Sequence, residues 1–338
     1  MILEEYTYEL PPELIAQAPA NPRDSTRLLI YDRKSEKTSF DVFRNVTKYL
    51  PKNSVLVLNQ TKVLPARLFA ETEHGGKVEL FYIAKRDDLI EFLARKKLKI
   101  NTVLKLDQHT FTVMKQEANR FYLKPSFAIE KLFDVLKQYG HTPLPPYIKQ
   151  SPLSEAEKRE QYQTVFAQQE GSVAAPTASL HFTPELLESL HNAGHTLVYV
   201  TLHVNLGTFA PVTEQQLQEK KLHEEYYEIS AESAEILQQA KQNTKPIIAV
   251  GTTVVRTLES AFANPSQPTL SGTTSLFIQP GYRFKMVDHL ITNFHVPKSS
   301  LLMLVAALTG REKLMELYQQ AINEKFRFFS FGDAMFIQ

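Results

Sequence analysis

The chain has 338 residues, 43% hydrophobic and 22% charged, which is typical of a globular protein and excludes a largely disordered chain. Its formal net charge is +1, so a nucleic-acid partner would have to meet a local basic surface and not bulk charge. The lack of cysteine excludes disulfides, thiolate nucleophiles and cysteine-based metal sites. The N-terminal residues have acidic groups where a signal peptide is basic, and the longest apolar run (301–308) is too short to span a bilayer, so we expect a cytoplasmic protein.

The first part of the chain predicts two strands. Residues 28–31 follow a turn at 21–25, whose Arg23 and Asp24 would ordinarily form a solvated, salt-bridged turn. Residues 55–58 are a continuous apolar run, as in a strand buried on both faces. Asn59 and Lys62 follow at once, and binding groups tend to lie at the carboxyl ends of such strands.

Short alternating segments between about residues 66 and 127 predict a small antiparallel barrel or sandwich. Because α/β texture flanks them, we expect a β-barrel domain (66–146) inserted into an α/β domain made of 1–65 and 147–338. A helix at 129–139 and a proline-rich linker at 142–147 would return the chain. Basic residues gather in this segment and form either a solvated face or a surface that follows a phosphate backbone; they are Lys85, Arg86, Arg95, Lys96, Lys97 and Lys99.

Residues 171–183 read GSVAAPTASLHFT and show neither strand nor helix periodicity. Small side chains in an ordered loop let a ligand or another backbone approach closely, and His181 adds a group that titrates near neutral pH. The alternative is a tight packing crossover with a structural histidine. A helix at 154–169 precedes this stretch, and Thr183 with Pro184 predicts the start of the next one.

The second half alternates between helices and strands. Helices are expected at 184–193, 214–222, 231–242 and 252–263, and strands at 196–204 and 246–250; Ser230 would cap the helix at 231–242. The alternation predicts a mostly parallel or mixed sheet covered by helices.

No dinucleotide fingerprint, P-loop or HExxH motif occurs, and the ten histidines are scattered, so a metal site has little support. Polar groups nevertheless follow several buried strands: Asn59, Lys62, His203, Thr252, Thr253, Arg256, Asn293, His295 and Lys298. A helix beginning at Gly251-Thr252-Thr253 would favour an anion such as a carboxylate or phosphate. Each residue alone has a structural explanation, but their convergence at one sheet edge favours a site.

Nine motifs in order resemble one enzyme family along nearly the whole chain. They are PANPRDSTRLL, LNQTKVLPARL, GGKVELF, PLPPYIK, QTVFAQQEGSVAAPTASLHFT, VTLHVNLGTFAPV, AVGTTVVRTLES, IQPGYRFKMVDHLITNFHVPKSSLLMLVAALTG and FRFFSFGDAMFI. The family is that of the S-adenosylmethionine:tRNA ribosyltransferase-isomerases of queuosine biosynthesis. The resemblance implies that the ribosyl part of S-adenosylmethionine is transferred to an aminomethyl-deazaguanine base at the tRNA wobble position, forming epoxyqueuosine and releasing adenine and methionine.

The resemblance also suggests roles for individual residues. His181 and His203 are the first candidates for the acid or base, followed by His223 and His295. Thr252 and Arg256 would hold the methionine carboxylate. The remaining predicted substrate-binding residues are Arg23 and Asp24, which would close the site, with Asn59, Lys62, Arg67, Thr177, Thr253, Asn293 and Lys298. S-adenosylmethionine is then the cosubstrate, no metal is required, and the expected partner of a monomeric protein is the tRNA anticodon loop.

The sequence departs from the usual family pattern at five positions. Asn205 and Ala210 stand where glycine and arginine are usual, and Gln60, Glu224 and Gln279 replace Asp, Ser and Tyr. Two other functions stay open: an S-adenosylmethionine-dependent RNA methyltransferase, against which the missing glycine-rich loop argues, and a non-catalytic RNA-binding protein.

Overall fold

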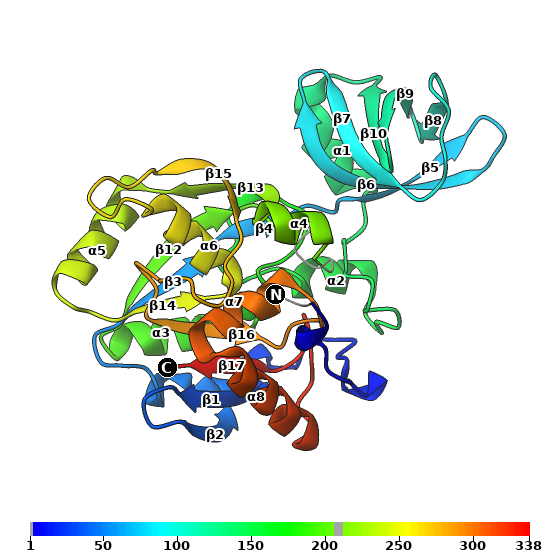
Figure 1. Ribbon diagram of the computed structural model, residues 1–338. Coiled ribbons are helices and arrows are strands. Elements are labelled where there is room, and N and C mark those ends of the chain that lie inside the picture. Colours follow the sequence, from blue (N-terminus) through cyan, green and yellow to red (C-terminus); the bar gives the residue numbers. More distant parts are fainter. Residues whose placement is uncertain (1–2, 206–211) are drawn as a thin grey trace.

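The computed structural model describes residues 3–205 and 212–338, which form a large sheet with helices on both faces and a small barrel beside it (Figure 1). The chain leaves for the barrel after β4 (Thr61–Val63) and has returned before β11 (Gln169–Ser172). The predicted fold class, a mixed α/β sheet with a small antiparallel barrel, is confirmed. The domain bounds at 65/66 and 146/147 stay a prediction.

Within the described residues the large sheet has nine strands. Across the sheet they are β15 (Ser271–Leu276), β13 (Lys221–Ile229), β12 (Thr196–Leu202), β3 (Val55–Asn59), β14 (Ile247–Val250), β16 (His289–Asn293), β17 (Ala334–Ile337), β1 (Arg27–Asp32) and β2 (Lys37–Val42). The neighbours β12, β3, β14 and β16 are parallel to one another. Their carboxyl ends therefore meet at one edge, where the sequence places its polar residues.

Alternating side chains of the central strands pack into two hydrophobic cores, one on each face of the sheet. On β3, Val55 and Val57 join the core beneath the helices α5–α8, whereas Leu56 and Leu58 join the core of the other face. That other face is covered by α3 and by the 3₁₀ helices η4 (Phe43–Lys48) and η6 (Thr177–His181). A strand buried on both faces explains the continuous apolar run in its sequence.

Side-chain caps begin most of the helices, as the sequence predicts for α3 and α5. Thr183 accepts a hydrogen bond from the Leu186 N–H, and Ser230 from the Ser233 N–H. The helices of this part of the chain are α3 (Pro184–Asn192), α4 (Glu214–Glu219), α5 (Ala231–Gln242), α6 (Thr252–Ala261), α7 (Ser300–Thr309) and α8 (Arg311–Asn323). Near the N-terminus lie the 3₁₀ helices η1 (Leu3–Tyr6), η2 (Pro12–Leu14) and η3 (Arg23–Ser25). Over the described ranges, none of the helices has the length and apolar character needed to cross a bilayer.

The barrel is closed by six antiparallel strands. In order around it they are β10 (Arg120–Pro125), β7 (Leu89–Ala94), β6 (Lys77–Arg86), β5 (Arg67–Thr72), β8 (Val103–Leu106) and β9 (His109–Glu117). After η5 (Ile129–Lys131), α1 (Leu132–Tyr139) packs its apolar residues into the barrel core. Gly140 then lies against the outgoing chain, where a Cβ atom would come within 1.8 Å of the Pro65 carbonyl oxygen.

Two expectations for the secondary structure are wrong. The helix expected at 154–169 is α2 (Glu155–Gln161) alone, and residues 169–172 form β11, which pairs in parallel with β4. The helix expected at 214–222 ends at Glu219, where Lys220 adopts a left-handed conformation with φ 53°. Residues 221–229, for which no strand was predicted, form β13 between β12 and β15. In both segments a neighbouring backbone supplies hydrogen bonds that the local pattern does not reveal.

Candidate active site

Two adjoining cavities lie at the carboxyl edge of the parallel strands. One is lined by Ala175, Pro176, Thr177, Ala178, Val204, Gly251, Thr252, Thr253, Thr292, Asn293, His295 and Leu301. The other is lined by Tyr147, Thr177, Asn293, Phe294, His295, Val296, Leu301, Phe329 and Ser330. We call them together the strand-end cavity, because they share Thr177, Asn293, His295 and Leu301. They hold about 20 and 10 Å³, so a nucleoside enters only when the walls move apart.

The amino end of α6 forms one wall of the strand-end cavity. Gly251 turns the chain from β14 into the helix with φ +95°, a conformation that favours glycine. Thr252 and Thr253 follow as the first helical residues, and both line the cavity. Thr253 is 7% exposed, and its Oγ1 has no hydrogen-bond partner among the described residues. A helix start with a spare hydroxyl is suited to bind an anion.

His295 brings an imidazole to the same cavity. Its Nε2 lies 2.8 Å from the Thr292 hydroxyl, and its backbone N–H donates to the Tyr318 hydroxyl at 2.8 Å. Burial lowers the pKa of His295 to about 3, so the ring is neutral at physiological pH. These hydrogen bonds therefore fix a neutral imidazole at the wall of the cavity.

Asn293 connects the cavity wall to His181. Its Oδ1 accepts from the Thr177 hydroxyl at 3.0 Å, and its Nδ2 lies 3.3 Å from His181 Nε2. His181 Nδ1 in turn lies 3.1 Å from the Thr26 hydroxyl. Burial, reinforced by nearby arginines, lowers the pKa of His181 to about 3. With both ring nitrogens engaged and no place in the cavity lining, His181 positions Asn293 in this structure.

Asn59 and His203 do not line the strand-end cavity. The Asn59 side chain donates to the Leu202 carbonyl at 3.0 Å and accepts from the Leu202 and Thr61 N–H groups, so it joins the ends of β3 and β12. His203 Nδ1 lies 2.8 Å from the Thr61 hydroxyl. A Cβ atom on Gly171 would approach His203 Nε2 to 2.7 Å, so the glycine allows this ring its place. Burial lowers the pKa of His203.

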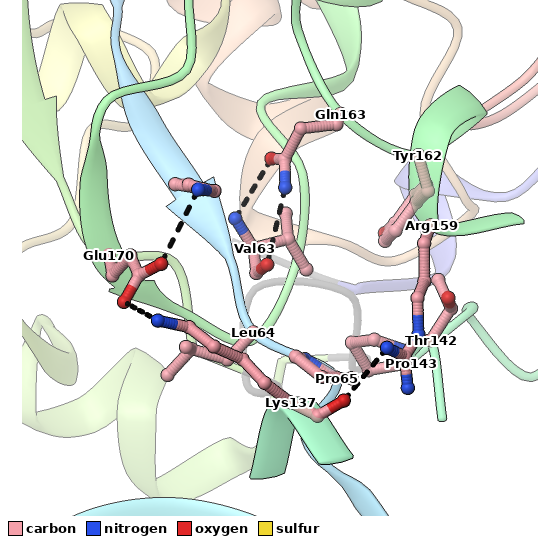
Figure 2. Close-up of a pocket in the computed structure, with 11 residues that line it drawn as sticks. Val63, Leu64, Pro65, Lys137, Thr142, Pro143, Arg159, Tyr162, Gln163 and Glu170 are labelled. Atoms are coloured by element: carbon pink, nitrogen blue, oxygen red, sulfur yellow. Dashed lines mark hydrogen bonds and ion pairs between the residues drawn. The ribbon is translucent and has the colours of Figure 1, made fainter. Parts of the chain in front are cut away.

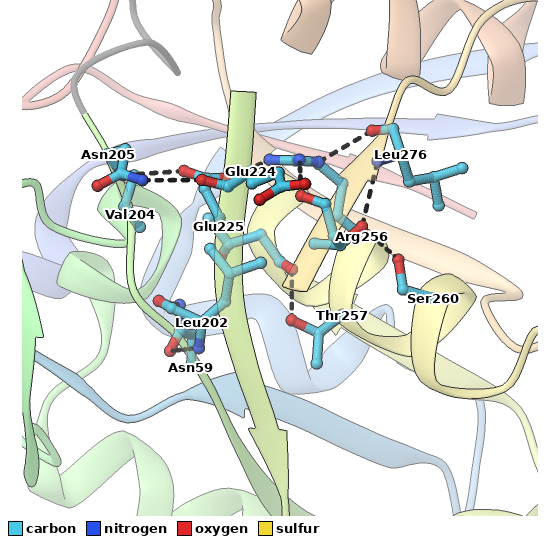
Figure 3. Close-up of polar contacts among 12 residues, drawn as sticks. Asn59, Leu202, Val204, Asn205, Glu224, Glu225, Arg256, Thr257, Ser260 and Leu276 are labelled. Carbon is cyan, nitrogen blue, oxygen red and sulfur yellow. Dashed lines mark hydrogen bonds and ion pairs between the residues drawn. The ribbon is translucent and has the colours of Figure 1, made fainter. Parts of the chain in front are cut away.

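Arg256 is engaged inside the protein (Figure 3). Its guanidinium forms a buried ion pair with Glu225, and it donates to the carbonyls of Leu276 at 3.1 Å and Thr274 at 3.3 Å. Glu225 also accepts the Asn205 N–H at 2.9 Å. This arrangement ties β13, α6, β15 and the chain after β12 together, and Arg256 does not line the strand-end cavity.

Arg23 and Asp24 lie in a turn that packs on α2. The Arg23 guanidinium donates to the carbonyls of Glu160 and Gln163, so it places a positive charge at the last turn of α2 and at the chain that follows. Asp24 lies 3.6 Å from Arg44. Neither residue lines the strand-end cavity, although their turn η3 contacts η6, which contributes Thr177 and Ala178 to the cavity wall.

Three further predicted residues also lie outside the strand-end cavity. Lys298 pairs with Glu4 at 2.7 Å. Arg67 lies on the barrel, paired with Glu79. His223 is exposed on β13.

Three of the residues that depart from the family pattern, Asn205, Glu224 and Gln60, lie near the end of β12. The Asn205 side chain donates to the Glu224 carbonyl at 3.0 Å, and Gln60 lies 3.4 Å from the Thr201 hydroxyl. The Gln279 amide nitrogen is buried with no partner among the residues the structure describes. Ala210 lies outside the described residues.

Sequence reasoning missed Tyr147 and Ser330. Their hydroxyls lie 2.6 Å apart, and both residues line the strand-end cavity. Tyr147 ends the proline-rich linker that returns from the barrel, and Ser330 precedes β17, so no local pattern connects them. The one available signal was the presence of both in the motifs PLPPYIK and FRFFSFGDAMFI.

A larger cavity of about 220 Å³ lies between the barrel and the sheet (Figure 2). We call it the junction cavity. It is lined by Lys62, Val63, Leu64, Pro65, Lys137, Thr142, Pro143, Arg159, Tyr162, Gln163 and Glu170. Lys62 is thus the predicted site residue that belongs to this cavity. Across residues 3–205 and 212–338, no group of His, Asp and Glu is arranged to hold a metal ion.

The fold is that of an α/β protein with a β-barrel beside its sheet and a cavity at the ends of its parallel strands. A family model described as "Queuosine biosynthesis protein" matches residues 3–337. The chain is 45% identical to the S-adenosylmethionine:tRNA ribosyltransferase-isomerases of Thermotoga maritima and Carboxydothermus hydrogenoformans, with 100% of each chain covered. A crystal structure of S-adenosylmethionine tRNA ribosyltransferase from Thermotoga maritima matches with a TM-score of 0.58 and 36% identity, covering 99% of this chain and 100% of that one.

The chain therefore belongs to the queuosine biosynthesis protein family. The family resemblance predicted from the ordered motifs is confirmed, and so is the prediction of an enzyme of tRNA modification.

Proposed function

We propose that this chain transfers and isomerises the ribosyl part of S-adenosylmethionine onto the 7-aminomethyl-7-deazaguanine base at the tRNA wobble position. The products are epoxyqueuosine in tRNA, adenine and methionine. The full-length relatives that carry this activity in their names support the proposal. We further propose that the protein acts as a monomer in the cytoplasm, with S-adenosylmethionine as a consumed cosubstrate and no metal.

The observation that carries the proposal is the convergence of an anion site and a neutral imidazole in one cavity. The start of α6, with the unpartnered hydroxyl of Thr253, suits the methionine carboxylate. Thr252 adds a second residue at the same helix start. This assignment replaces Arg256, whose guanidinium is already bound by Glu225.

His295 is the proposed base. The sulfonium of S-adenosylmethionine acidifies the adjoining 5′-carbon, and the His295 imidazole, held by Thr292 at the cavity wall, is positioned to accept that proton. Of the four predicted histidines, His295 is the one among the residues that line the strand-end cavity. His181 and His203 are proposed as positioning residues, because the first holds Asn293 and the second packs on Gly171.

The adjoining polar groups supply contacts for the leaving groups. Thr177, Asn293, Tyr147 and Ser330 present hydroxyl and amide groups around His295. We propose that they orient the ribose and the departing adenine by hydrogen bonds. The walls must open for this, since the cavity is smaller than a nucleoside.

The test is a reaction of the purified protein with S-adenosylmethionine and tRNA that carries the aminomethyl-deazaguanine base, followed by mass analysis of nucleosides and small products. Adenine, methionine and an epoxyqueuosine nucleoside are expected. S-adenosylhomocysteine would instead identify a methyltransferase, and RNA binding without turnover would identify a binding protein. The variant His295→Asn should form no product while it still binds tRNA.

A further inference from the structure

The junction cavity brings together cations from three elements that are distant in the sequence. Lys62 comes from β4, Lys137 from α1 beside the barrel, and Arg159 from α2 (Figure 2). Opposite them the lining holds one carboxylate, that of Glu170 on β11. With Glu155, which contacts Arg159, three cations face two carboxylates, so the site keeps a net positive charge, which favours an anionic ligand.

Glu170 holds the two lysines in place. Its carboxylate lies 2.8 Å from Lys137 Nζ and 3.4 Å from Lys62 Nζ, so one negative charge is shared between two ammonium groups. Burial acts to raise the pKa of Glu170, but the contacts with Lys137 and Lys62 outweigh it, and the pKa is lowered. Both lysine side chains remain nearly half exposed. A ligand oxygen can therefore reach each ammonium group from the solvent side.

Arg159 adds a cation with a fixed orientation. Its guanidinium donates to the carbonyls of Lys137 and Gly140, at the end of α1, and lies 3.4 Å from Glu155. Since Glu155 also accepts the Thr142 N–H at 2.7 Å, α2 holds both the end of α1 and the returning chain. The cations of the cavity are thus set by the contacts between the barrel and the sheet.

The junction cavity lies next to the strand-end cavity. Tyr162 lines the junction cavity and packs in one apolar cluster with Ala175, which lines the strand-end cavity. β11 runs from Glu170 in the first lining towards Ala175 in the second. A ligand that spans both sites would place its anionic part between barrel and sheet and its reacting part at the strand ends.

We propose that the junction cavity binds a backbone phosphate of the tRNA anticodon loop, with Lys62 and Lys137 as its ligands. This inference rests on the proposed function, since it assigns the second site to the same RNA substrate. It explains why two lysines converge on a single carboxylate at the edge of a solvent-open cavity. The opposing explanation is that these ion pairs serve only to hold the barrel against the sheet.

The test compares three variants by equilibrium binding of a fluorescently labelled anticodon hairpin across a salt series. Lys137→Gln should flatten the slope of log affinity against log salt by roughly 0.7–0.9, the contribution of one phosphate contact. Lys131→Gln, an exposed lysine just before α1 that does not line the cavity, is the matched control and should change the slope less.

Glu170→Gln separates the two explanations. If the cavity binds phosphate, removing the competing carboxylate frees both ammonium groups, and hairpin affinity rises. If the ion pairs only hold the barrel, the same variant weakens binding, and the proposal is overturned. A wild-type salt slope in the folded Lys137→Gln variant also overturns it.

Hairpins with a single uncharged methylphosphonate linkage locate the phosphate. One such hairpin should bind the wild type more weakly and Lys137→Gln with no further loss. Equal losses in both proteins at every linkage would contradict the assignment. These binding measurements do not depend on turnover. Hairpin binding without product formation would refute the proposed function but not the phosphate site. Product formation with an unchanged tRNA KM in Lys137→Gln would refute the phosphate site but not the proposed function.

Discussion

Replacing Arg256 by methionine tests whether this residue holds the fold or the substrate. The change keeps much of the side-chain length but leaves the Glu225 carboxylate, 2% exposed, without its guanidinium. Breaking one partner of a buried ion pair costs about 3–5 kcal/mol of unfolding free energy. At about 2 °C per kcal/mol for a domain of this size, the melting temperature should fall by about 6–10 °C.

Urea unfolding followed by far-ultraviolet circular dichroism measures the change. The double variant Arg256→Met/Glu225→Gln should recover most of the loss, because an amide can still accept the Asn205 N–H and the buried negative charge is removed. The surface pair Lys313–Glu316, 2.6 Å apart, is the control, and Lys313→Met should cost no more than about 1 kcal/mol. A stable Arg256→Met protein with a greatly raised KM for S-adenosylmethionine would refute this reasoning and restore Arg256 as a ligand of the methionine carboxylate.

Three further outcomes are expected. Thr253→Val removes a buried hydroxyl that lacks a hydrogen-bond partner among the described residues, so it should keep or slightly raise the melting temperature while it raises the KM for S-adenosylmethionine severalfold. The control Thr47→Val removes another such hydroxyl and should leave that KM unchanged. Equal KM values in both variants would contradict the assignment of Thr253. His181 and His295 have pKa values of about 3 in the folded chain, below that of an unfolded histidine, so the unfolded state takes up more protons as the pH falls below about 6.5. Between about pH 7.5 and 5.5 each histidine should therefore subtract about 1.4 kcal/mol from the unfolding free energy. A urea-unfolding free energy that does not change over this pH range would argue against their burial as neutral rings. Gly140→Ala places a methyl group against the backbone of the outgoing chain and should destabilise the protein by about 1–3 kcal/mol or more, whereas an unchanged calorimetric melting temperature would show that the crossing can widen.

Strands and helices with strong local sequence patterns could be predicted. The apolar run of β3 and the capped starts of α3 and α5 follow from the sequence alone. The strand β13 was not, because its buried face includes Glu225 and its exposed face includes Tyr226, so the sequence shows no apolar alternation. Such strands form by pairing with strands that are distant in the sequence, so the local sequence does not predict them.

The candidate site was predictable in position but not in the roles of its residues. Parallel strand ends predicted where polar residues gather, and Thr253, Asn293 and His295 lie there. Arg256 was given a ligand-binding role because its partner, Glu225, lies 31 positions away and nothing in the intervening sequence connects them. Tyr147 was missed for the same reason, since its contact with Ser330 spans 183 positions.

The order of strands across the sheet has a consequence for how the protein forms. β17, the final strand in chain order, lies in the interior of the sheet between β16 and β1. β1 is the first strand to be synthesised, and the edge of β1 that pairs in parallel with β17 has no partner until β17 has been made. The barrel strands, by contrast, pair with partners made shortly before or after them. During synthesis the barrel can therefore close while the sheet is incomplete, and the amino-terminal strand depends on the most distant part of the chain.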